Sequence, residues 1–446
     1  MNNLSRFKQS ILLIGDLATL YLALIVTLWL RYDNLFYAEL VNRHIAPFTI
    51  IFGIWIIIYY IAGLYDPQML KNGFAFETRF LYTIFANIII AALFFYGVRY
   101  FAITPKTNLG IFLLIFGGFN YLWRQLYNVL LTKTGTVSRV LLIGSNKTAE
   151  ELAEAIQNNP QLGYKIKFWM KEGLLDKEFE HLAQIIIANQ INTLVIPAHL
   201  KKDSKAAKLI YKTLVLGIEV ADLAALYESV FQKIPLAELE EVWFLENLAK
   251  KHKIYEIISG PLEILLALIL TMILLPLAVL IIILIKLTSP GSAFFTQKRV
   301  GKNGKEFVIW KFRTMQSDAE KDGAQWANYY KDSRVTPIGK VLRWTHLDEL
   351  PQLYNILRGE LSFVGPRPER PEFVEKLRKE LPYYDLRHLA KPGVTGWAQI
   401  NYRYAASVQD SYQKLQYDIY YIKNNSPLLD FLIILKTIKF LIANHS

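Results

Sequence analysis

The sequence, 446 residues long, contains no cysteine. A chain without cysteine cannot form a disulfide, bind a metal through thiolates or use a cysteine as a nucleophile. These kinds of framework and site are therefore excluded.

The composition also lacks the balance of an ordinary soluble protein. Hydrophobic residues make up 53% of the chain and aromatic residues 14%, while charged residues still make up 20%. This is too apolar for a soluble protein and too charged for one that lies wholly in a membrane. Domains commonly contain roughly 100 to 200 residues, so two or three folded units are expected. We therefore predict a protein that is partly in a bilayer and partly in water.

Four apolar stretches lie near the N-terminus. Each approaches the ~20 residues that a helix needs to cross a bilayer. The first has no small-residue cleavage site and is followed by further stretches, so we expect it to remain as an anchor. The sequence predicts a transmembrane domain of four helices over residues 1–135, formed by Ile11–Leu30, Phe48–Leu64, Leu81–Val98 and Leu109–Trp123.

Positive charge after the fourth stretch indicates which side of the membrane the chain reaches. An even number of crossings returns the chain to its starting side, and Arg124, Lys133 and Arg139 lie at or after the end of the fourth stretch. Positively charged flanks mark the cytoplasmic side. The remainder of the chain is therefore expected to face the cytoplasm.

Residues 136–250 show short apolar runs that alternate with helical stretches. Arg139–Ile143 and Thr193–Pro197 have the pattern of strands, and Thr148–Asn158 and Ser204–Leu216 have the pattern of helices. This alternation predicts a small parallel sheet in a Rossmann-like α/β domain. The first turn from strand to helix lacks G-x-G-x-x-G, so a close backbone approach to a pyrophosphate is not encoded. A bound nucleotide and a structural, oligomerising or regulatory role both remain open.

A further apolar stretch, Ile264–Ile285, is long enough to cross a bilayer. Lysines precede and follow it, so both of its ends carry the charge that marks the cytoplasmic side. Pro276 lies near its middle, where the missing N–H and the ring bend a helix. We therefore favour a re-entrant helix at about residues 261–286, which enters and leaves by the same face, over a straight span.

The net charge of +12 is concentrated in the last third of the chain. From Lys286 onward there are 25 Lys and Arg residues against 16 Asp and Glu residues. A basic surface beside a membrane segment suits anionic headgroups, phosphates or nucleic acid, and a solubilising face is the alternative. Because the cations lie among Pro-Gly turns and form no dense stripe, nucleic-acid binding is not expected.

The most informative segment contains two adjacent acids, Asp348 and Glu349. Proline is favoured at the first position of a helix and glycine just after its end, so Pro351–Arg358 is predicted to be a short helix closed by Gly359. The acids then precede a helix N-terminus, which favours ionised carboxylates and also receives a phosphate. Such a pair suits a nucleophile beside a ligand for a hard cation such as Mg²⁺. A simple helix cap is the alternative.

Three further segments supply basic and amide side chains. Lys311 and Arg313 flank an aromatic residue after a strand-like run, a pattern that is also common at a solvated strand end. Arg367 lies between two prolines, which restrict the backbone and suit a guanidinium that binds phosphate. Lys391–Gln399 combines a cation, Pro and Gly turns and an amide. It suits a nucleotide or a sugar, with an ordinary surface turn as the alternative.

Together, in this order and spacing, these segments resemble the bacterial sugar transferases called monotopic phosphoglycosyl transferases. The region from about Ser259 to the C-terminus carries the resemblance, and the whole chain is similar to their long, undecaprenyl-phosphate glucose phosphotransferase-like form. The matching segments are Ser289-Pro290-Gly291, Lys311-Phe312-Arg313-Thr314-Met315, Leu347-Asp348-Glu349-Leu350-Pro351-Gln352-Leu353, Val364-Gly365-Pro366-Arg367-Pro368 and Lys391–Gln399.

The resemblance implies a catalytic domain over residues 251–446 that transfers a hexose-1-phosphate from a UDP-sugar to undecaprenyl phosphate. It implies that Asp348 attacks the sugar-bearing phosphate, releases UMP and forms an aspartyl-phosphosugar, which the lipid phosphate then attacks. Glu349 would help to hold Mg²⁺. The same matching gives candidates for phosphate or nucleotide-sugar contacts, namely Lys311, Arg313, Arg343, Arg367 and Gln399.

The resemblance also implies a location and a product. It implies a multi-pass protein of the bacterial inner membrane whose middle and catalytic domains face the cytoplasm. The product would start a lipid-linked glycan for exopolysaccharide, capsule or O-antigen. The identity of the sugar and the existence of a homodimer are left open. A catalytically inactive membrane scaffold or regulator of polysaccharide assembly is the competing function; it predicts a missing acid or cation, and all the matched ones are present.

The predicted fold class is therefore a membrane protein that combines α and α/β parts. The family's re-entrant helix is commonly broken at a Ser-Pro pair, whereas this chain has Leu275-Pro276. Without the serine hydroxyl, the bend is expected to be shallower or to use Thr271 one turn earlier.

Leu428–Ile442 contains three charged residues and no uninterrupted spanning length. It is predicted to be an interfacial amphipathic helix, with packing on the domain core as the alternative.

Overall fold

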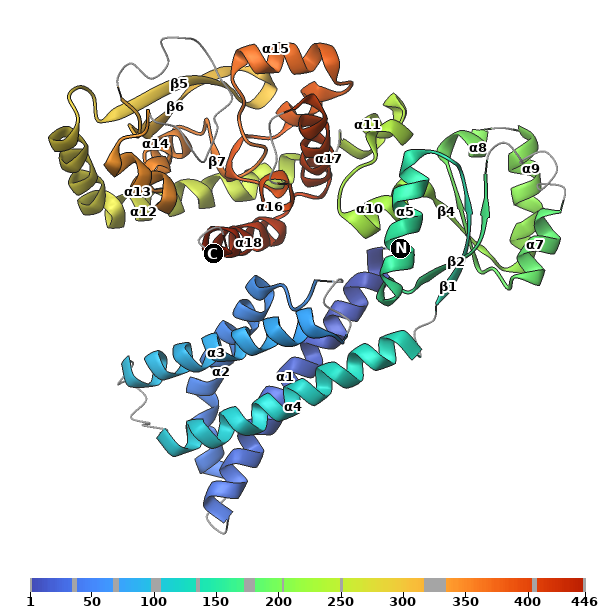
Figure 1. The fold of residues 1–446 in the computed structure, drawn as a ribbon, viewed down its shortest axis with the longest axis horizontal. Helices are drawn as coiled ribbons and strands as arrows, with labels where there is room; N and C mark the ends of the chain where they lie inside the picture. The colour runs from blue at the N-terminus through green and yellow to red at the C-terminus, as the bar shows by residue number, and fades with distance from the viewer. Residues whose placement is uncertain are drawn as a thin grey trace. The chain divides into compact units, whose positions relative to one another are not determined.

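The structure is a computed structural model, and the parts of the chain that it describes form two compact units, Met1–Phe231 and Gln232–Ser446. Helices predominate in both (Figure 1). The described residues are 2–33, 38–66, 72–97, 106–133, 137–171, 181–202, 204–248, 252–316, 334–402 and 407–443.

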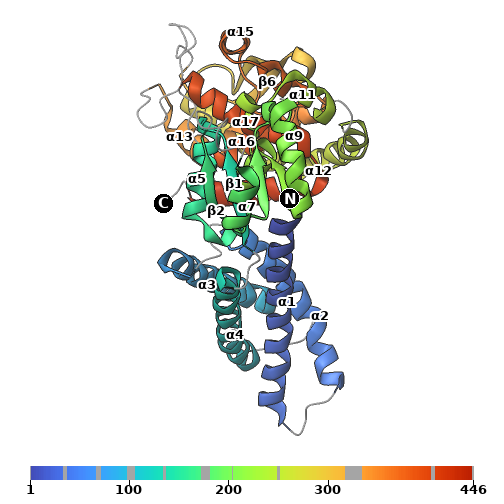
Figure 2. The same cartoon turned by 90° about the vertical axis from the view of Figure 1, so that its right-hand side faces the viewer.

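The first unit begins with four long helices. They are α1 (Asn2–Tyr32), α2 (Ala38–Ala62), α3 (Phe74–Gly97) and α4 (Lys106–Lys133). Each covers all or nearly all of one of the four apolar stretches, so the prediction of helices there is confirmed. Figure 2 shows α1, α2, α3 and α4 as one bundle of helices.

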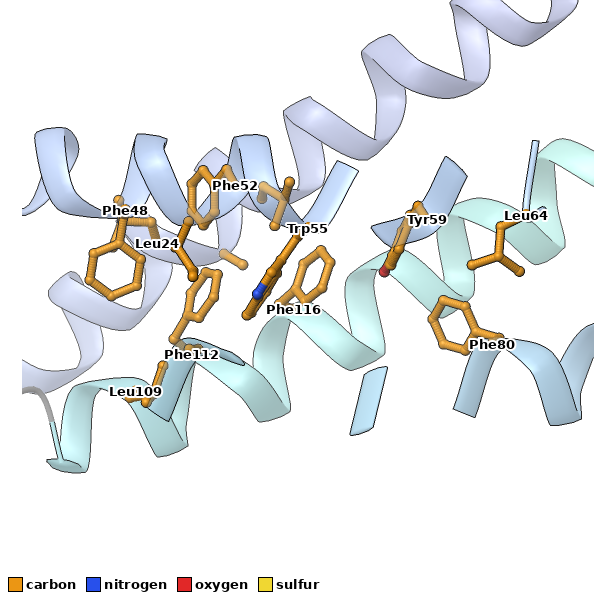
Figure 3. Close-up of a cluster of buried hydrophobic side chains, with 14 of the residues drawn as sticks. Leu24, Phe48, Phe52, Trp55, Tyr59, Leu64, Phe80, Leu109, Phe112 and Phe116 are labelled. Carbon is orange, nitrogen blue, oxygen red and sulfur yellow. The ribbon is translucent and has the colours of Figure 1, made fainter. Parts of the chain in front are cut away.

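Aromatic side chains fill the centre of this bundle (Figure 3). Trp55 stacks on Phe112 with ring centroids 5.8 Å apart, and its ring lies 5.2 Å from that of Phe116. The outer faces are apolar as well, since Leu93 and Leu114 are 68% and 81% exposed. Helices that are apolar on every side are typical of a lipid environment, because exposing these apolar side chains to water would cost free energy.

One polar cluster lies inside the apolar bundle. Arg124 of α4 pairs with Asp16 of α1 at 2.5 Å, and neither side chain is more than 1% exposed. Asn120 and Tyr65 each donate a hydrogen bond to the Asp16 carboxylate. Tyr59 of α2 donates one to Asn120. Because a buried charge is costly unless it is paired and hydrogen-bonded, this cluster fixes how α1, α2 and α4 pack.

Within the described residues, four helices are long and apolar enough to cross a membrane. Three are the segments Gln9–Tyr32, Glu39–Ala62 and Phe76–Gly97 of the N-terminal bundle, and the fourth is Ser259–Thr288 of the second unit. Helix α4 lies outside this group, since its apolar stretch is short and ends at Arg124, so the predicted fourth crossing stays a prediction.

The first unit continues as a parallel sheet with the strand order β2-β1-β3-β4. The predicted strands and helices over 139–216 are confirmed, and two strands are added that the sequence did not reveal. Helices α7 and α9 pack on one face of the sheet, and α5 and α10 pack on the other. The elements are β1 (Ser138–Ile143), α5 (Lys147–Asn158), η4 (Pro160–Leu162), β2 (Tyr164–Met170), α7 (Leu182–Ala188), β3 (Thr193–Ile196), α8 (Ala198–Lys202), α9 (Ser204–Thr213), η6 (Leu214–Leu216), β4 (Glu219–Asp222) and α10 (Leu223–Phe231).

The second unit begins earlier in the chain than the predicted domain boundary. Residues 232–248 include η7 (Leu236–Glu238) and α11 (Glu241–Leu248). Ile234 and Phe244 belong to the same buried cluster as Trp397, whose indole N–H also donates a hydrogen bond to the carbonyl oxygen of Gln232. The structure therefore groups 232–248 with the C-terminal part, not with the α/β domain. The predicted boundaries themselves, at 135/136 and 250/251, lie outside the described residues.

The long apolar helix of the second unit is α12 (His252–Thr288), with Pro261 and Pro276 inside it. Figure 1 shows it as two arms that meet at a bend. The hydroxyl of Thr271 donates a hydrogen bond to the carbonyl oxygen of Ala267 at 2.7 Å. Such a bond to the residue four positions earlier often bends a helix, and Thr271 is the residue that the sequence analysis named for this purpose.

After α12 in the chain, β5 (Phe294–Val300) and β6 (Glu306–Phe312) form an antiparallel hairpin. Its turn has Asn303 and Gly304 in the left-handed region, which is the backbone that an Asn-Gly hairpin turn adopts. The remaining elements are η8 (Lys302–Gly304), α13 (Pro337–Thr345), η9 (Leu347–Glu349), α14 (Gln352–Leu357), β7 (Ser362–Val364), α15 (Pro371–Glu380), η10 (Tyr384–Leu389), β8 (Gly393–Thr395), α16 (Trp397–Asn401), α17 (Val408–Asn424) and α18 (Pro427–Ala443).

Helix α18 covers the predicted C-terminal amphipathic stretch. Ile433 is fully buried in the core of the unit, which agrees with packing on the domain. Leu428, Phe431 and Ile438 are 67%, 48% and 41% exposed and leave an apolar face uncovered. The helix therefore packs on the core of the domain with one face and leaves an apolar face open. Its contact with a membrane stays a prediction.

Candidate active site

The two acids lie on a tight turn between two helices. Helix α13 starts at Thr336, whose hydroxyl accepts a hydrogen bond from the backbone N–H of Gly339, and ends at His346 in the left-handed region. Asp348 and Glu349 follow on the single 3-10 turn η9. The predicted short helix is confirmed as α14, and Gly359 after it has φ +73°.

Glu349 is held by two cations from distant parts of the sequence. Its Oε1 lies 2.5 Å from Nζ of Lys311 on β6 and 3.2 Å from Nη2 of Arg367, which follows β7. The carboxylate is 14% exposed. Charge-assisted hydrogen bonds in a place with little water are the strong ones, so this arrangement fixes Glu349 in its ionised form.

Asp348 is in the opposite situation. Within the described residues, no hydrogen bond or ion pair reaches its carboxylate. Burial raises the pKa of Asp348, the charge of Glu349 raises it further, and Lys311 and Arg343 oppose both effects. The side chain is therefore an unpaired carboxylate whose basicity is increased by its surroundings.

The two acids therefore differ in proton affinity although they are neighbours. Burial alone would raise the pKa of Glu349, but Lys311 and Arg367 outweigh burial and lower its pKa to about 2. A folded-state pKa below the ordinary value of 4.5 stabilises the fold above that pH, and the contribution is lost as the pH falls towards 2. Pairs of titratable groups whose surroundings separate their pKa values are common in active sites.

Arg313 lies at the end of α12 and not at the acids. Its guanidinium donates hydrogen bonds to the carbonyl oxygens of Ser289 and Pro290, at 2.8 and 2.7 Å, and to the hydroxyl of Ser289 at 2.6 Å. Within the described part of the chain it makes no contact with Asp348 or Glu349. Cations that donate to the last carbonyls stabilise a helix C-terminus, so Arg313 acts here on the structure of the Ser-Pro-Gly turn.

We expect Gly291→Ala to be more damaging than a comparable substitution in the β5–β6 turn. Gly291 has φ +109°, and a Cβ there would lie 2.6 Å from Nη1 of Arg313. The strained backbone and the displaced guanidinium together should cost about 2–3 kcal/mol of unfolding free energy. Gly304 has φ +73° with no atom within 4 Å of its Cβ position, so Gly304→Ala should cost about 1 kcal/mol. Thermal unfolding in detergent measures both, and equal losses would contradict the packing assigned to Arg313.

The other two predicted contact residues, Arg343 and Gln399, differ in their surroundings. Nε of Arg343 donates a hydrogen bond to the hydroxyl of Thr314 at 2.9 Å, and its charge lowers the pKa of Asp348. Gln399 donates from Nε2 to the carbonyl oxygen of Val394 at 3.2 Å, while its buried Oε1 has no hydrogen-bond partner among the described residues. Arg343 thus belongs to the electrostatic surroundings of the acids, whereas Gln399 makes no contact with them in the described residues.

The structure adds charged residues that the sequence analysis missed. Arg299 of β5 is part of the group around Arg367, and burial lowers its pKa to about 10. Arg387 of η10 and Asp418 of α17 form a buried ion pair beneath the same segment. A small pocket beside them is lined by Val300, Gly301, Pro366, Arg367, Pro368, Glu369, Arg387, His388, Ala390 and Pro392.

These features are those of a membrane protein whose second unit carries a site suited to anions. It has a bundle of apolar helices and a second unit with its own apolar helix. In that unit a fixed carboxylate and an unpaired one lie beside Lys311, Arg343 and Arg367. Anions such as phosphates are the ligands that a cation cluster of this kind attracts.

The comparison with known proteins agrees with this class. Residues 254–444 match the family described as bacterial sugar transferase. A protein of Caulobacter vibrioides, named a UDP-glucose:undecaprenyl-phosphate glucose-1-phosphate transferase, is 40% identical over 188 residues, which are 42% of this chain and 70% of that protein. The chain belongs to the bacterial sugar transferase family.

Two further relatives show how far the similarity extends. An Aeromonas hydrophila protein, named a UDP-N-acetylgalactosamine-undecaprenyl-phosphate N-acetylgalactosaminephosphotransferase, is 47% identical over 42% of this chain, and the match spans only 44% of that protein's length. A UDP-glucose:undecaprenyl-phosphate glucose-1-phosphate transferase of Xanthomonas campestris is 29% identical over 71% of this chain and 69% of its own length. The similarity to the Xanthomonas protein therefore extends beyond the C-terminal unit.

Proposed function

We propose that the protein transfers a hexose-1-phosphate from a UDP-sugar to undecaprenyl phosphate, releases UMP and so starts a lipid-linked glycan. The observation that carries this proposal is the contrast between the two acids. Glu349 is fixed by Lys311 and Arg367, whereas Asp348 is unpaired in the described structure and has a raised pKa. A group that is free to form a bond, beside cations that hold a phosphate, is what covalent phosphate transfer requires. The names of the relatives support the two substrates.

In the first step, a carboxylate oxygen of Asp348 attacks the phosphorus that bears the sugar. The bond from that phosphorus to the oxygen of the α-phosphate breaks, and UMP leaves with the electron pair. The product is an aspartyl-phosphosugar. Lys311 and Arg343 lower the pKa of Asp348 against the larger effect of burial and so favour its ionised form, and the guanidinium of Arg367 suits the charge that develops on the phosphate oxygens.

In the second step, an oxygen of undecaprenyl phosphate attacks the phosphorus of the aspartyl-phosphosugar. The acyl phosphate bond breaks and restores the Asp348 carboxylate, and a diphosphate now joins the lipid to the sugar. Neither step needs a net proton transfer, because both leaving groups depart as anions. The chain therefore needs cations near the acids more than it needs a general acid.

The donor atoms at this site fit Mg²⁺. Lys311 and Arg367 both contact Oε1 of Glu349, so Oε2 and the Asp348 carboxylate remain as oxygen donors. Mg²⁺ is usually bound through one or two carboxylates together with substrate phosphates and water. Among the described residues, no group of three or more His, Asp or Glu side chains is placed to hold a metal ion. When bound, the ion would neutralise phosphate charge.

We also propose that α12 is re-entrant. Its first half packs through Ala267 against Ile356 of α14, and its second half packs through Ile285 against Leu342 of α13. Both halves thus contact one globular part. A straight helix of 37 residues would be about 55 Å long and would carry one half far from the other. The contacts and the bend favour a helix that enters the membrane and returns on the cytoplasmic side.

The absence of cysteine makes this topology directly measurable, because single cysteines can be introduced without background. In a re-entrant helix, cysteines at exposed Ile257 and Leu287 should both react with an impermeant maleimide added to inside-out vesicles, since both ends face the cytoplasm. Neither should react in intact spheroplasts. Reaction of one from each side would mean that α12 spans the bilayer.

Lipid-dependent release of UMP tests the proposed function. Purified protein would be incubated with undecaprenyl phosphate, Mg²⁺ and, in separate reactions, UDP-glucose, UDP-galactose and their N-acetylated counterparts. We expect at least one sugar to give UMP only when the lipid is present. If none gives lipid-dependent UMP, the proposed function is wrong.

A further inference from the structure

Arg367 lies in the segment Pro366–Glu369, in which every backbone carbonyl oxygen accepts a hydrogen bond. The carbonyl oxygen of Pro366 accepts from the backbone N–H of Gly393 at 3.0 Å, and that of Glu369 accepts from Val300 at 3.0 Å. The two carbonyl oxygens between these accept hydrogen bonds from arginine side chains. Arg387 donates to the carbonyl oxygen of Arg367 at 3.0 Å, and Arg299 donates to that of Pro368 at 3.0 Å. Four consecutive carbonyls are therefore fixed by donors from three distant parts of the chain.

Arg387 is itself held from the other side. Its Nη1 donates to the hydroxyl of Tyr384 at 2.7 Å, and its Nη2 lies 2.9 Å from Oδ2 of Asp418. The side chains of Arg387 and Asp418 are only 7% and 2% exposed. A buried ion pair adds little to stability compared with apolar residues of similar size, but it fixes the positions of its members. The pair therefore suits a role in positioning better than a role in stability alone.

We infer that Arg387, held by Asp418 and Tyr384, is a positioning residue that sets the place of Arg367 relative to Glu349. This inference rests on the proposed function, because it makes Arg367 the group through which Arg387 affects the reaction. The carbonyl of Arg367 is fixed by Arg387 at one end of the residue, and its guanidinium is fixed by Glu349 at the other. A displacement of about 1 Å in a phosphate-binding group can cost about 100-fold in rate.

A double-mutant cycle tests this relation, with lipid-dependent UMP release as the first readout. Arg387→Lys keeps the charge beside Asp418 but lacks the planar guanidinium that reaches three partners at once. We expect kcat to fall by about 10- to 100-fold with little change in KM, because the contact from Arg367 strengthens in the transition state. In an Arg367→Lys background, Arg387→Lys should lower kcat by no more than about twofold. Additive losses would overturn the inference.

A milder variant covers the case in which Arg387→Lys fails to fold. Tyr384→Phe removes only the hydroxyl that accepts from Arg387 and keeps the buried ring. Its effect on kcat should be smaller, about threefold to tenfold, and should likewise vanish in the Arg367→Lys background. Arg378→Lys is the matched control, since Arg378 forms an exposed pair with Asp385 in the same unit. It should leave kcat unchanged in either background.

Hydrogen exchange gives a second readout that needs no substrate. In Arg387→Lys, the backbone amides of Val300 and Gly393, which donate hydrogen bonds to this segment, and of Gly365, which donates to Thr395, should exchange faster than in the unaltered protein, while those of β6 should not. Faster exchange without any UMP release in the unaltered protein would support the positioning role and refute the proposed function. Unchanged exchange at the amides of Gly365, Val300 and Gly393 would overturn the positioning role, even if the protein is active.

Discussion

Asp348→Asn should abolish lipid-dependent UMP release, with a loss of at least about 10⁴-fold. Asparagine has nearly the same shape but no anionic oxygen that can attack phosphorus. Because the surroundings raise the pKa of Asp348, they oppose its ionisation at neutral pH. Replacing the charge with an amide should therefore leave the melting temperature unchanged or raise it. UMP release and thermal unfolding of the same preparation measure both effects.

Asp385→Asn is the matched control for this variant. Asp385 lies in the same unit and is 55% exposed, in a surface pair with Arg378. It should keep nearly full activity. Substantial turnover in Asp348→Asn would remove the covalent mechanism, and a folded but equally inactive Asp385→Asn would show that the assay responds to charge in general.

Lys311→Met should lower activity at pH 7 by about 100-fold and should shift the pH profile. Lys311 is the strongest of the groups that lower the pKa of Asp348, so its loss should raise that pKa further. Since Asp348 must be ionised to attack, the acid limb of the kcat/KM profile should move to higher pH. Activity should recover partly as the pH increases. The loss also leaves Arg367 as the remaining ion-pair partner of Glu349.

Lys298→Met gives the comparison for Lys311→Met, because Lys298 forms an exposed pair with Glu306 on the same hairpin. Exposed pairs contribute at most about 1 kcal/mol, so neither its activity nor its pH profile should change noticeably. A Lys311→Met profile that falls in height without moving along the pH axis would contradict the assigned effect on Asp348.

Much of the fold could be predicted because it is encoded locally. The apolar stretches gave the N-terminal helices, and the alternation of strands and helices gave the parallel sheet. Two strands were missed for physical reasons. β2 carries Lys165 and Lys167 on its outward positions, and β4 has only two apolar residues between Glu219 and Asp222, so neither forms the apolar run that a buried strand shows. The domain boundary near 250 was misplaced relative to the compact units because residues 232–248 have a helical pattern whose partner, the core around Trp397, lies far along the chain.

The candidate site also has residues that local sequence patterns indicate and residues that only the fold brings together. Asp348, Glu349 and Arg367 could be named as candidates because a proline, a glycine or an adjacent acid marks them in the sequence. The partners of Glu349 come from positions 311 and 367, and no local pattern shows that they meet on one oxygen. Arg313 has a motif like theirs, yet its guanidinium lies at the end of α12. Arg387 and Asp418 are single residues 31 positions apart, and only the folded chain brings them under the Arg367 segment.

The covalent intermediate is the most direct test of the central claim, that Asp348 is the nucleophile. The protein would be incubated with Mg²⁺ and its UDP-sugar in the absence of lipid, then digested and analysed by mass spectrometry. We expect up to one UMP per protein and a hexose-phosphate on the peptide that contains Asp348, which is discharged when undecaprenyl phosphate is added. A protein that releases UMP in a lipid-dependent reaction, yet forms no such adduct and no UMP burst without lipid, would contradict the account.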